Sequence, residues 1–448
     1  MTVGTLSQGG AGLAARVERA QDGAGPLRLG KVTAALGLSV TVQGLDAAVG
    51  EVLTIHTDQG SAAAEVVAVG VQGLVCMPLA SLHGLRTGAL VTSTGGPMRI
   101  GVGRELRGRI LDGLGQPLDG GPGLAELEQV DVENAAPNPL LRSRIDTPLG
   151  LGVRALDAMV PCGRGQRLGL FAGSGVGKSS LLSMVARGTE ATISVVALVG
   201  ERGREVREFI ENDLGEEGLA RSVVVVATSD QPPMVRLRAA FVATRIAEWF
   251  RDEGDDVVLM MDSLTRAAMA QREVGLSVGE PPATRGYPPS VFALLARLLE
   301  RAGPGERGTI TGLYTVLVEG DDHNEPIADT ARSILDGHVV LDRRLASAAH
   351  FPSIDVLESI SRVAPAVTST AQRADAAVLR RLLAAHRDVR ELVEIGAYVA
   401  GTNPDADQAR ALWPHITAFL RQDINERCTA ADAWASLRAL VTEGDPTP

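Results

Sequence analysis

From Leu149 onward, short apolar runs alternate with amphipathic stretches, and this alternation predicts strands that are followed by helices. The expected strands are Leu168–Phe171, Ile193–Val199, Val223–Ala227, Val257–Met261, Thr309–Val316 and His338–Leu341. Apolar residues at helical spacing lie between several of them, as in Pro233–Phe250 and Ser290–Arg301. Because strands without polar positions are buried on both faces, the pattern predicts an α/β core with a mostly parallel sheet covered on both sides by helices.

The segments that flank this core have different patterns. Between about Leu27 and Thr94, closely spaced apolar runs are separated by glycine turns, which predicts a small β-barrel that serves as a scaffold or assembly collar. After about Thr370 the apolar residues keep helical spacing, which predicts a helical C-terminal domain. Gly101–Pro148 is rich in glycine and proline and is expected to be an ordered connector.

The first 25 residues are small and polar, with glycines that break any long element. Leu13, Val17 and Ala20 have helical spacing, but so short a helix does not persist alone in water. The segment is therefore either a frayed tail or a partner-docking segment. The predicted divisions are 1–25 for this flexible tail, 26–95 for the barrel, 96–375 for the α/β domain and 376–448 for the helical domain.

Composition narrows the class of protein. A chain of 448 residues is too long for one compact core, and its net charge of −11 argues against a general nucleic-acid binder. Val66–Leu85 carries no formal charge and is long enough to span a membrane, but Pro78, polar residues and glycines interrupt it, so two soluble strands are favoured. The cysteines match no metal-ligand spacing and are interpreted as reduced thiols of a cytosolic protein without a secretory signal: Cys76, Cys162 and Cys428.

A glycine-rich loop directly after Leu168–Phe171 is the clearest chemical motif. Its glycines let the backbone approach a ligand closely, and its N–H groups together with the following helix N-terminus form an anion site. Lys178 can reach the β and γ phosphates of ATP, and the hydroxyl of Ser179 can ligate Mg²⁺. A chance glycine turn is the alternative, and Ala172 stands where the strict motif has glycine. The candidate ATP-binding residues are Gly173, Ser174, Gly175, Val176, Gly177, Lys178, Ser179 and Ser180.

A carboxylate follows the predicted strand Val257–Met261. Ligands of open parallel sheets bind at the carboxyl ends of the strands, so Asp262 should lie near the glycine-rich loop. We expect Asp262 and Ser179 to hold Mg²⁺, with the aspartate acting mainly through bound water. The alternative is that Asp262 only caps a helix that begins near Thr265.

A second carboxylate, Glu201, follows the predicted strand Ile193–Val199. It is the candidate for orienting and polarising the water that attacks the γ-phosphate. The alternative is a salt bridge from Glu201 to Arg202 or Arg204. Arg202 and Arg266 are expected to support the phosphate end of the site.

Together these stretches resemble the flagellar and type III secretion export ATPases, which are related to the catalytic subunit of the rotary ATP synthase. The resemblance covers roughly Leu27 to the C-terminus, and it implies a P-loop, RecA-like core between a small β-barrel and a helical C-terminal domain. The motifs that carry it are Gly169–Ser179, Gly200–Phe209, Met261–Arg266, Gly320–Asp329 and Ser359–Val363, with Val102–Arg104 and Gly108–Asp119 at the entry to the core.

The resemblance also implies a second half of the site. In this family six copies form a ring with ATP at the subunit interfaces, and Arg362 matches the arginine finger that reaches the neighbour's γ-phosphate. Phe351 matches the aromatic residue that stacks on adenine, whereas the other side of that pocket, near Ile424, has no clear aromatic. The non-catalytic rotary subunits lack the carboxylate found here as Glu201, so the resemblance implies an active homohexamer.

The leading functional hypothesis is an ATP-hydrolysing export ATPase that releases and unfolds substrates from chaperones and feeds a membrane export gate. The resemblance implies a regulator on the N-terminal tail, a central stalk protein, chaperone–substrate complexes, no nucleic acid, and a cytoplasmic location at the inner membrane. The form of Phe171–Lys178 favours flagellar over virulence secretion. The alternatives are a rotary ATPase or ATP synthase subunit, an RNA-translocating ring and a non-enzymatic nucleotide-binding scaffold.

Overall fold

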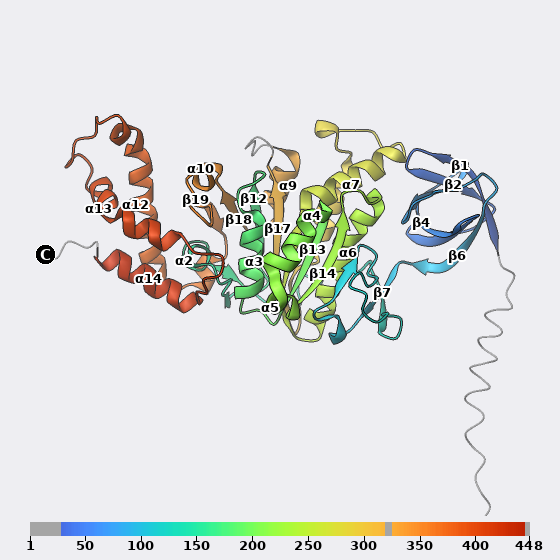
Figure 1. The fold of residues 1–448 in the computed structure, drawn as a ribbon, viewed down its shortest axis with the longest axis horizontal. Helices are drawn as coiled ribbons and strands as arrows, with labels where there is room; N and C mark the ends of the chain where they lie inside the picture. Colours follow the sequence, from blue (N-terminus) through green and yellow to red (C-terminus); the bar gives the residue numbers. More distant parts are fainter. Residues whose placement is uncertain (1–27, 319–324, 444–448) are drawn as a thin grey trace, which may run out of the picture. The chain divides into compact units, whose positions relative to one another are not determined.

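The computed structural model describes residues 28–318 and 325–443 (Figure 1). The proposed docking tail lies outside these residues, and so do the first five residues of the Gly320–Asp329 motif. One compact unit ends at Pro97 and the other begins at Met98. Within the described ranges, no helix is long and apolar enough to cross a membrane.

The first unit contains a closed antiparallel barrel, whose described strands follow the order β1-β2-β5-β4-β3-β6. Alternate side chains such as Val40, Val42, Leu53 and Ile55 are completely buried and fill its interior. The predicted barrel is thus confirmed, and most of Val66–Leu85 forms strands as expected. The strands are β1 Leu29–Leu36, β2 Ser39–Gln43, β3 Glu51–Thr57, β4 Gly60–Gly70, β5 Gly73–Pro78 and β6 Leu90–Pro97.

The second unit is built on a mixed sheet, whose described strands follow the order β19-β18-β12-β17-β15-β13-β14-β8, with β16 paired to β17. All neighbours pair in parallel except β18 with β19 and β16 with β17. The α/β class and all six predicted strands are confirmed. The strands are β8 Ile110–Asp112, β12 Arg167–Ala172, β13 Ile193–Glu201, β14 Ser222–Thr228, β15 Asp256–Asp262, β16 Gly303–Pro304, β17 Thr309–Leu317, β18 Gly337–Leu341 and β19 Ile354–Ser361.

Helices follow most strands of this sheet (Figure 1). The long helix α6 packs on β13, β14 and β15, and α7 packs on β17 and β13. The predicted helices Pro233–Phe250 and Ser290–Arg301 are confirmed as α6 and α8. The helices are α2 Arg154–Met159, α3 Lys178–Gly188, α4 Gly203–Glu208, α5 Gly215–Ala220, α6 Pro233–Asp252, α7 Leu264–Ser277, α8 Pro289–Glu300, α9 Pro326–Ile334, α10 Arg343–Ser347 and α11 Ala364–Val367, with the shorter or irregular turns η1 Arg104–Leu106, η2 Phe209–Leu214 and η3 Thr284–Gly286.

The glycine- and proline-rich segment after the barrel contains more strand than its composition suggested. β7 Arg99–Val102 pairs with β9 Glu128–Asp131, and β8 adds an edge strand to the main sheet. Two further short strands, β10 Pro148–Leu149 and β11 Cys162–Gly163, pair with each other. Runs of two to four residues are too short to show a period, so pairing with distant strands decides their conformation.

The C-terminal part is helical, as predicted, with α12 Thr370–Glu394, α13 Pro404–Leu420 and α14 Ala430–Glu443. Ser369 and Gln372 form a capping box that begins α12. Leu379, Ile416 and Leu437 from these helices belong to the same buried apolar cluster as Leu168 of the sheet. The helices therefore extend the core of the second unit.

Candidate active site

The glycine-rich loop joins the central strand β12 to α3. Gly175 and Gly177 have φ values of 76° and 90°, which side-chain-bearing residues rarely adopt. Ser353 Oγ donates to the carbonyl of Val176 at 2.6 Å, and Arg343 Nη1 donates to that of Ser174 at 3.2 Å. Side chains outside the loop thus hold its backbone in place. The first backbone N–H groups of α3, which follows the loop, form an anion-binding helix N-terminus.

Lys178, at the start of α3, brings the two predicted carboxylates together. Its Nζ lies 2.5 Å from Oδ1 of Asp262 and 3.5 Å from Oε1 of Glu201. The three side chains are only 13%, 4% and 14% exposed. Because β12, β13 and β15 run in parallel, their carboxyl ends meet at one edge of the sheet, and the three residues predicted from separate motifs form one cluster.

Burial and charge oppose each other in this cluster. Burial raises the pKa of the Glu201 carboxyl, although the nearby Lys178 acts in the opposite direction. Burial also disfavours the charged form of Lys178, but Asp262 and Glu201 outweigh it and raise the pKa of the lysine. The arrangement therefore keeps a fixed cation beside a carboxylate that accepts protons more readily than an exposed glutamate.

A buried hydroxyl orients Asp262. Thr315, near the end of β17, donates through Oγ1 to Oδ1 of Asp262 at 2.8 Å. The N-cap of α7 is Ser263, whose side chain accepts from Arg266 N, so the interpretation of Asp262 as a helix cap is wrong. Thr315 belongs to no sequence motif; its one signal is a hydroxyl residue near the carboxyl end of an apolar strand.

The oxygen donors near the loop suit Mg²⁺, which prefers hard ligands such as the Asp262 carboxylate and the Ser179 hydroxyl. No group of three or more His, Cys, Asp or Glu residues in the described ranges is arranged to hold a metal. Mg²⁺ bound with nucleotide usually takes only one or two protein ligands and completes its shell with water and phosphate. The charged Lys178 already lies against Asp262, which shows that this carboxylate accommodates a cation.

Arg202 and Arg204 do not pair with Glu201. Arg202 is 74% exposed and its guanidinium lies 3.5 Å from Glu205, while Arg204 pairs with Glu205 and Glu208. The alternative of a salt bridge from Glu201 to these arginines is therefore wrong. In this structure Arg202 forms a surface ion pair, and its predicted support of the phosphates stays a prediction.

Arg362 and the phosphate loop lie at opposite ends of the strands of the sheet. It follows β19, which runs antiparallel to β18, so that Ser361 pairs with Gly337 at the start of β18. The phosphate loop instead follows Ala172, which pairs with Leu341 at the end of β18. The exposed Arg362 donates to the carbonyl of Arg332 at 3.2 Å. Its location fits a group that serves a neighbouring copy.

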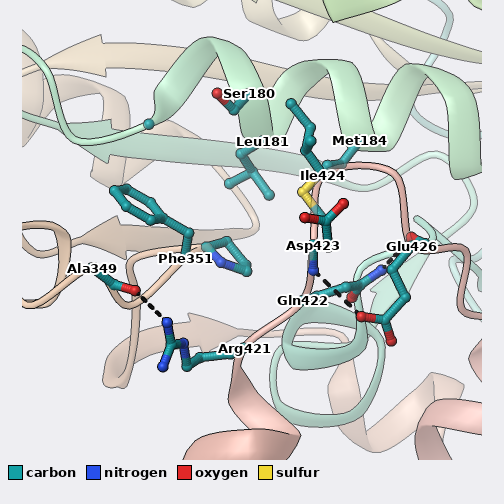
Figure 2. Close-up of a pocket in the computed structure, with 12 residues that line it drawn as sticks. Ser180, Leu181, Met184, Ala349, Phe351, Arg421, Gln422, Asp423, Ile424 and Glu426 are labelled. Carbon is teal, nitrogen blue, oxygen red and sulfur yellow. Dashed lines mark hydrogen bonds between the residues drawn. The ribbon is translucent and has the colours of Figure 1, made fainter.

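A cavity of about 630 Å³ lies beside the phosphate loop (Figure 2). Phe351, which is 45% exposed, lies on one side of it, and Ile424 and Asp423 lie on the other. Leu181 and Met184 of α3 line it between them. A Cβ atom placed on Gly177 would lie 3.4 Å from the Phe351 ring, so the aromatic face lies next to the loop. The cavity thus has an aromatic side chain on one side and aliphatic Ile424 among polar residues on the other, with room for a planar base between them.

Comparison with known proteins gives a consistent result over nearly the whole chain. Residues 152–361 match the nucleotide-binding domain of the ATP synthase alpha/beta family, and residues 368–439 match the C-terminal domain of the type III secretion ATPase EscN. The chain is 50% identical to a flagellum-specific ATP synthase of Bacillus subtilis, over 92% of this chain and 95% of that protein. It is 48% identical to a type 3 secretion system ATPase of Xanthomonas euvesicatoria, over 93% of this chain and 94% of that protein.

A solved structure extends the comparison to three dimensions. The assembled ATPase EscN of enteropathogenic E. coli, in complex with its central stalk EscO, superimposes with a TM-score of 0.85 and 43% identity. The match covers 92% of this chain and 100% of the EscN chain. The barrel, the sheet and the C-terminal helices are thus shared with that protein.

Proposed function

The chain belongs to the family of flagellar and type III secretion ATPases, and from this membership we propose that it hydrolyses Mg²⁺-bound ATP to support flagellar-type protein export. The observation that carries the proposal is the cluster of Lys178, Glu201 and Asp262 at the phosphate loop. The relatives are named ATPase or ATP synthase, and this chain has a lysine and two carboxylates, none more than 14% exposed, at its phosphate loop.

Each group of the cluster has a separate task in the proposed reaction. Lys178 and the α3 N-terminus bind the phosphates, and Glu201 accepts a hydrogen bond from the attacking water and orients it. Asp262 and Ser179 would hold Mg²⁺, which when bound neutralises developing charge on the phosphates. Phosphoryl transfer needs little covalent chemistry from the protein, so positioning and fixed charge suffice.

We further propose a homohexamer in which Arg362 of one copy completes the site of the next. Arg362 is exposed and lies at the end of the strands that is away from its own phosphate loop. This location supports a role between subunits. By analogy with EscN, a central stalk protein is a proposed partner. A regulator on the N-terminal tail, an export gate, chaperone–substrate complexes and a cytoplasmic location at the inner membrane complete the proposal.

The substitution Glu201→Gln tests the hydrolytic role. It keeps the side-chain volume but removes the carboxylate, so ATP binding should persist while kcat falls by roughly 10²–10⁴-fold. The matched control is Glu211→Gln, which removes one carboxylate of an exposed ion pair with Arg207. A Glu201→Gln protein that hydrolyses ATP at the native rate would remove Glu201 from the proposed mechanism.

A further inference from the structure

The cavity beside the phosphate loop is called the base cavity below. Its wall opposite Phe351 is formed by residues 421–426, an irregular segment between α13 and α14. It contributes Gln422 and Ile424 to the cavity (Figure 2). Since no helix or strand of its own fixes this segment, its distance from Phe351 depends on side chains that hold it from outside. Gln422 and Arg154 make several of these contacts, and Arg187 of α3 adds hydrogen bonds to the carbonyl of Ile424 and to the side chain of Asn425 at 2.6 and 3.2 Å.

Gln422 is 5% exposed and uses its whole amide group. Its Oε1 accepts from the backbone N–H of Arg154 at 2.8 Å, and its Nε2 donates to the carbonyls of Gly152 and Glu426, both at 2.9 Å. A primary amide offers one acceptor oxygen and two N–H donors, so each group has a partner. The side chain therefore ties the segment to the loop that precedes α2.

The backbone of Gln422 also connects the two sides of the cavity. Its N–H donates to the carbonyl of Phe351 at 3.0 Å. Next to it, Arg421 Nη2 donates to the carbonyl of Ala349 at 2.7 Å (Figure 2). Two hydrogen bonds, one from the Gln422 backbone and one from the Arg421 side chain, therefore join the two sides of the base cavity and set its width.

Arg154, the first residue of α2, holds both ends of the segment. Its Nη1 donates to the carbonyls of Ala418, Phe419 and Arg421 at 3.3, 3.3 and 3.1 Å, and its guanidinium forms an ion pair with Glu426. These carbonyls include ones at the C-terminal end of α13, which lack intrahelical partners and attract a cation. The arginine side chain is 16% exposed, so water competes weakly for these contacts.

We propose that Gln422 and Arg154 are positioning residues that hold the 421–426 wall opposite Phe351 and so set the affinity and selectivity for the nucleotide base. The proposal rests on the nucleotide-binding function proposed above. A wall that is already in place does not have to be ordered when the base binds, and this pre-organisation increases affinity. The phosphate loop is held by Ser353 and Arg343, which are different residues from those that hold this wall, so we expect phosphate binding to depend less on the wall than base binding does.

The test compares a ligand that has a base with one that has none, on the full-length protein. With Gln422→Ala, we expect the Kd and the KM for Mg²⁺–ATP to rise about tenfold, because several buried hydrogen bonds are lost. The Kd for Mg²⁺–tripolyphosphate and the kcat at saturating ATP should stay within about twofold, since phosphate contacts remain. The preference for ATP over GTP should fall.

Arg154→Lys provides the second variant, because lysine keeps the charge but has one nitrogen in place of the two with which the guanidinium contacts the α13 carbonyls and Glu426 at the same time. This variant should likewise bind ATP more weakly while its Kd for tripolyphosphate stays nearly unchanged. It tests the proposal if Gln422→Ala fails to fold. The control is Arg381→Ala, which removes an exposed ion pair with Asp405 between α12 and α13.

Two results would overturn the proposal: unchanged ATP affinity in the folded variants, or an equal loss of affinity for ATP and tripolyphosphate. Failure of the underlying function looks different. In that case the native protein would not hydrolyse ATP at all, while the ratio of the two affinities would still be measurable by titration calorimetry.

Discussion

The ammonium of Lys178 lies 2.5 Å from Oδ1 of Asp262. The lysine proposed to bind the phosphates is therefore paired with the carboxylate proposed to bind the metal. Thr315 donates to the same oxygen at 2.8 Å and holds the carboxylate in this orientation. In the nucleotide-bound state the phosphates would replace Asp262 as the partner of Lys178, and a metal would replace Lys178 as the partner of Asp262. Each exchange leaves the group with a partner of opposite charge.

This exchange predicts that Asp262→Asn strengthens ATP binding without Mg²⁺ and slows turnover with Mg²⁺. Without Mg²⁺, ATP must compete with Asp262 for Lys178, so the variant should bind ATP a few-fold more tightly. With Mg²⁺, its turnover should fall by roughly 10³-fold because the metal loses a charged ligand. Titration calorimetry in EDTA measures the binding, and a phosphate-release assay in Mg²⁺ measures the turnover. Weaker Mg²⁺-free binding by the variant would show that the Lys178–Asp262 pair does not compete with ATP.

The location of Arg362 predicts complementation between subunits. Arg362→Ala alone and Glu201→Gln alone should each bind ATP but hydrolyse it poorly. In mixed rings, an intact Glu201 on one copy can meet an intact Arg362 on the next, so mixing the two inactive proteins should restore part of the activity.

The matched control for Arg362→Ala is Arg390→Ala, which removes an exposed ion pair with Glu394 and should not impair hydrolysis. Crosslinking must show that the two proteins assemble together. Mixed assemblies that stay inactive would place Arg362 outside the neighbour's site.

A buried ion pair predicts a large effect on stability. Arg301 donates through Nε and Nη2 to the two oxygens of Glu248 at 2.7 and 2.8 Å, and both side chains are at most 1% exposed. Arg301→Met leaves Glu248 with Asn134 and Arg245 as its partners in the described part of the chain, and should lower the free energy of unfolding by roughly 3 kcal/mol. Arg301→Met with Glu248→Met should cost less, because no unpaired charge stays buried. Urea unfolding of all the variants measures this; a double variant less stable than the single one would contradict it.

The buried Asp157 predicts a pH dependence of stability. Burial raises the pKa of its carboxyl from 3.8 to about 7, against hydrogen bonds from the N–H groups of Leu151 and Gly152. Between these values the folded chain binds more protons than the unfolded chain, so the stability contributed by Asp157 falls as pH rises through this window.

Asp157→Asn removes this titration. The difference in unfolding free energy between the native chain and the variant should change by up to about 4 kcal/mol between pH 4 and pH 7, and then level off. Urea titrations at several pH values give that difference. A constant difference across the window would mean that Asp157 titrates near its ordinary pKa.

The local pattern of apolar, polar and glycine residues predicts much of the fold and half of the site. The apolar runs locate the six barrel strands, in which alternate side chains are buried, and the six central strands of the sheet, which are buried on both faces. Both patterns are local, so they need no distant information to be recognised. The apolar runs do not predict β19, an edge strand in which buried Ile354 and Val356 alternate with half-buried residues, because it has no continuous apolar run. Phosphate chemistry requires glycines, a lysine and a hydroxyl in sequence, so the loop is visible without a structure.

The amino-acid order therefore determines the local elements and the separate chemical groups: the loop ending at Lys178, and the carboxylates that end two strands. Only the folded chain decides which groups meet. Thr315 reaches Asp262, Ser353 holds the loop, and Gln422 joins the base cavity to α2 because contacts far apart in the sequence form when the sheet and the C-terminal helices pack. Strand direction likewise places Arg362 away from its own loop, since an antiparallel edge strand returns the chain to the other end of the sheet.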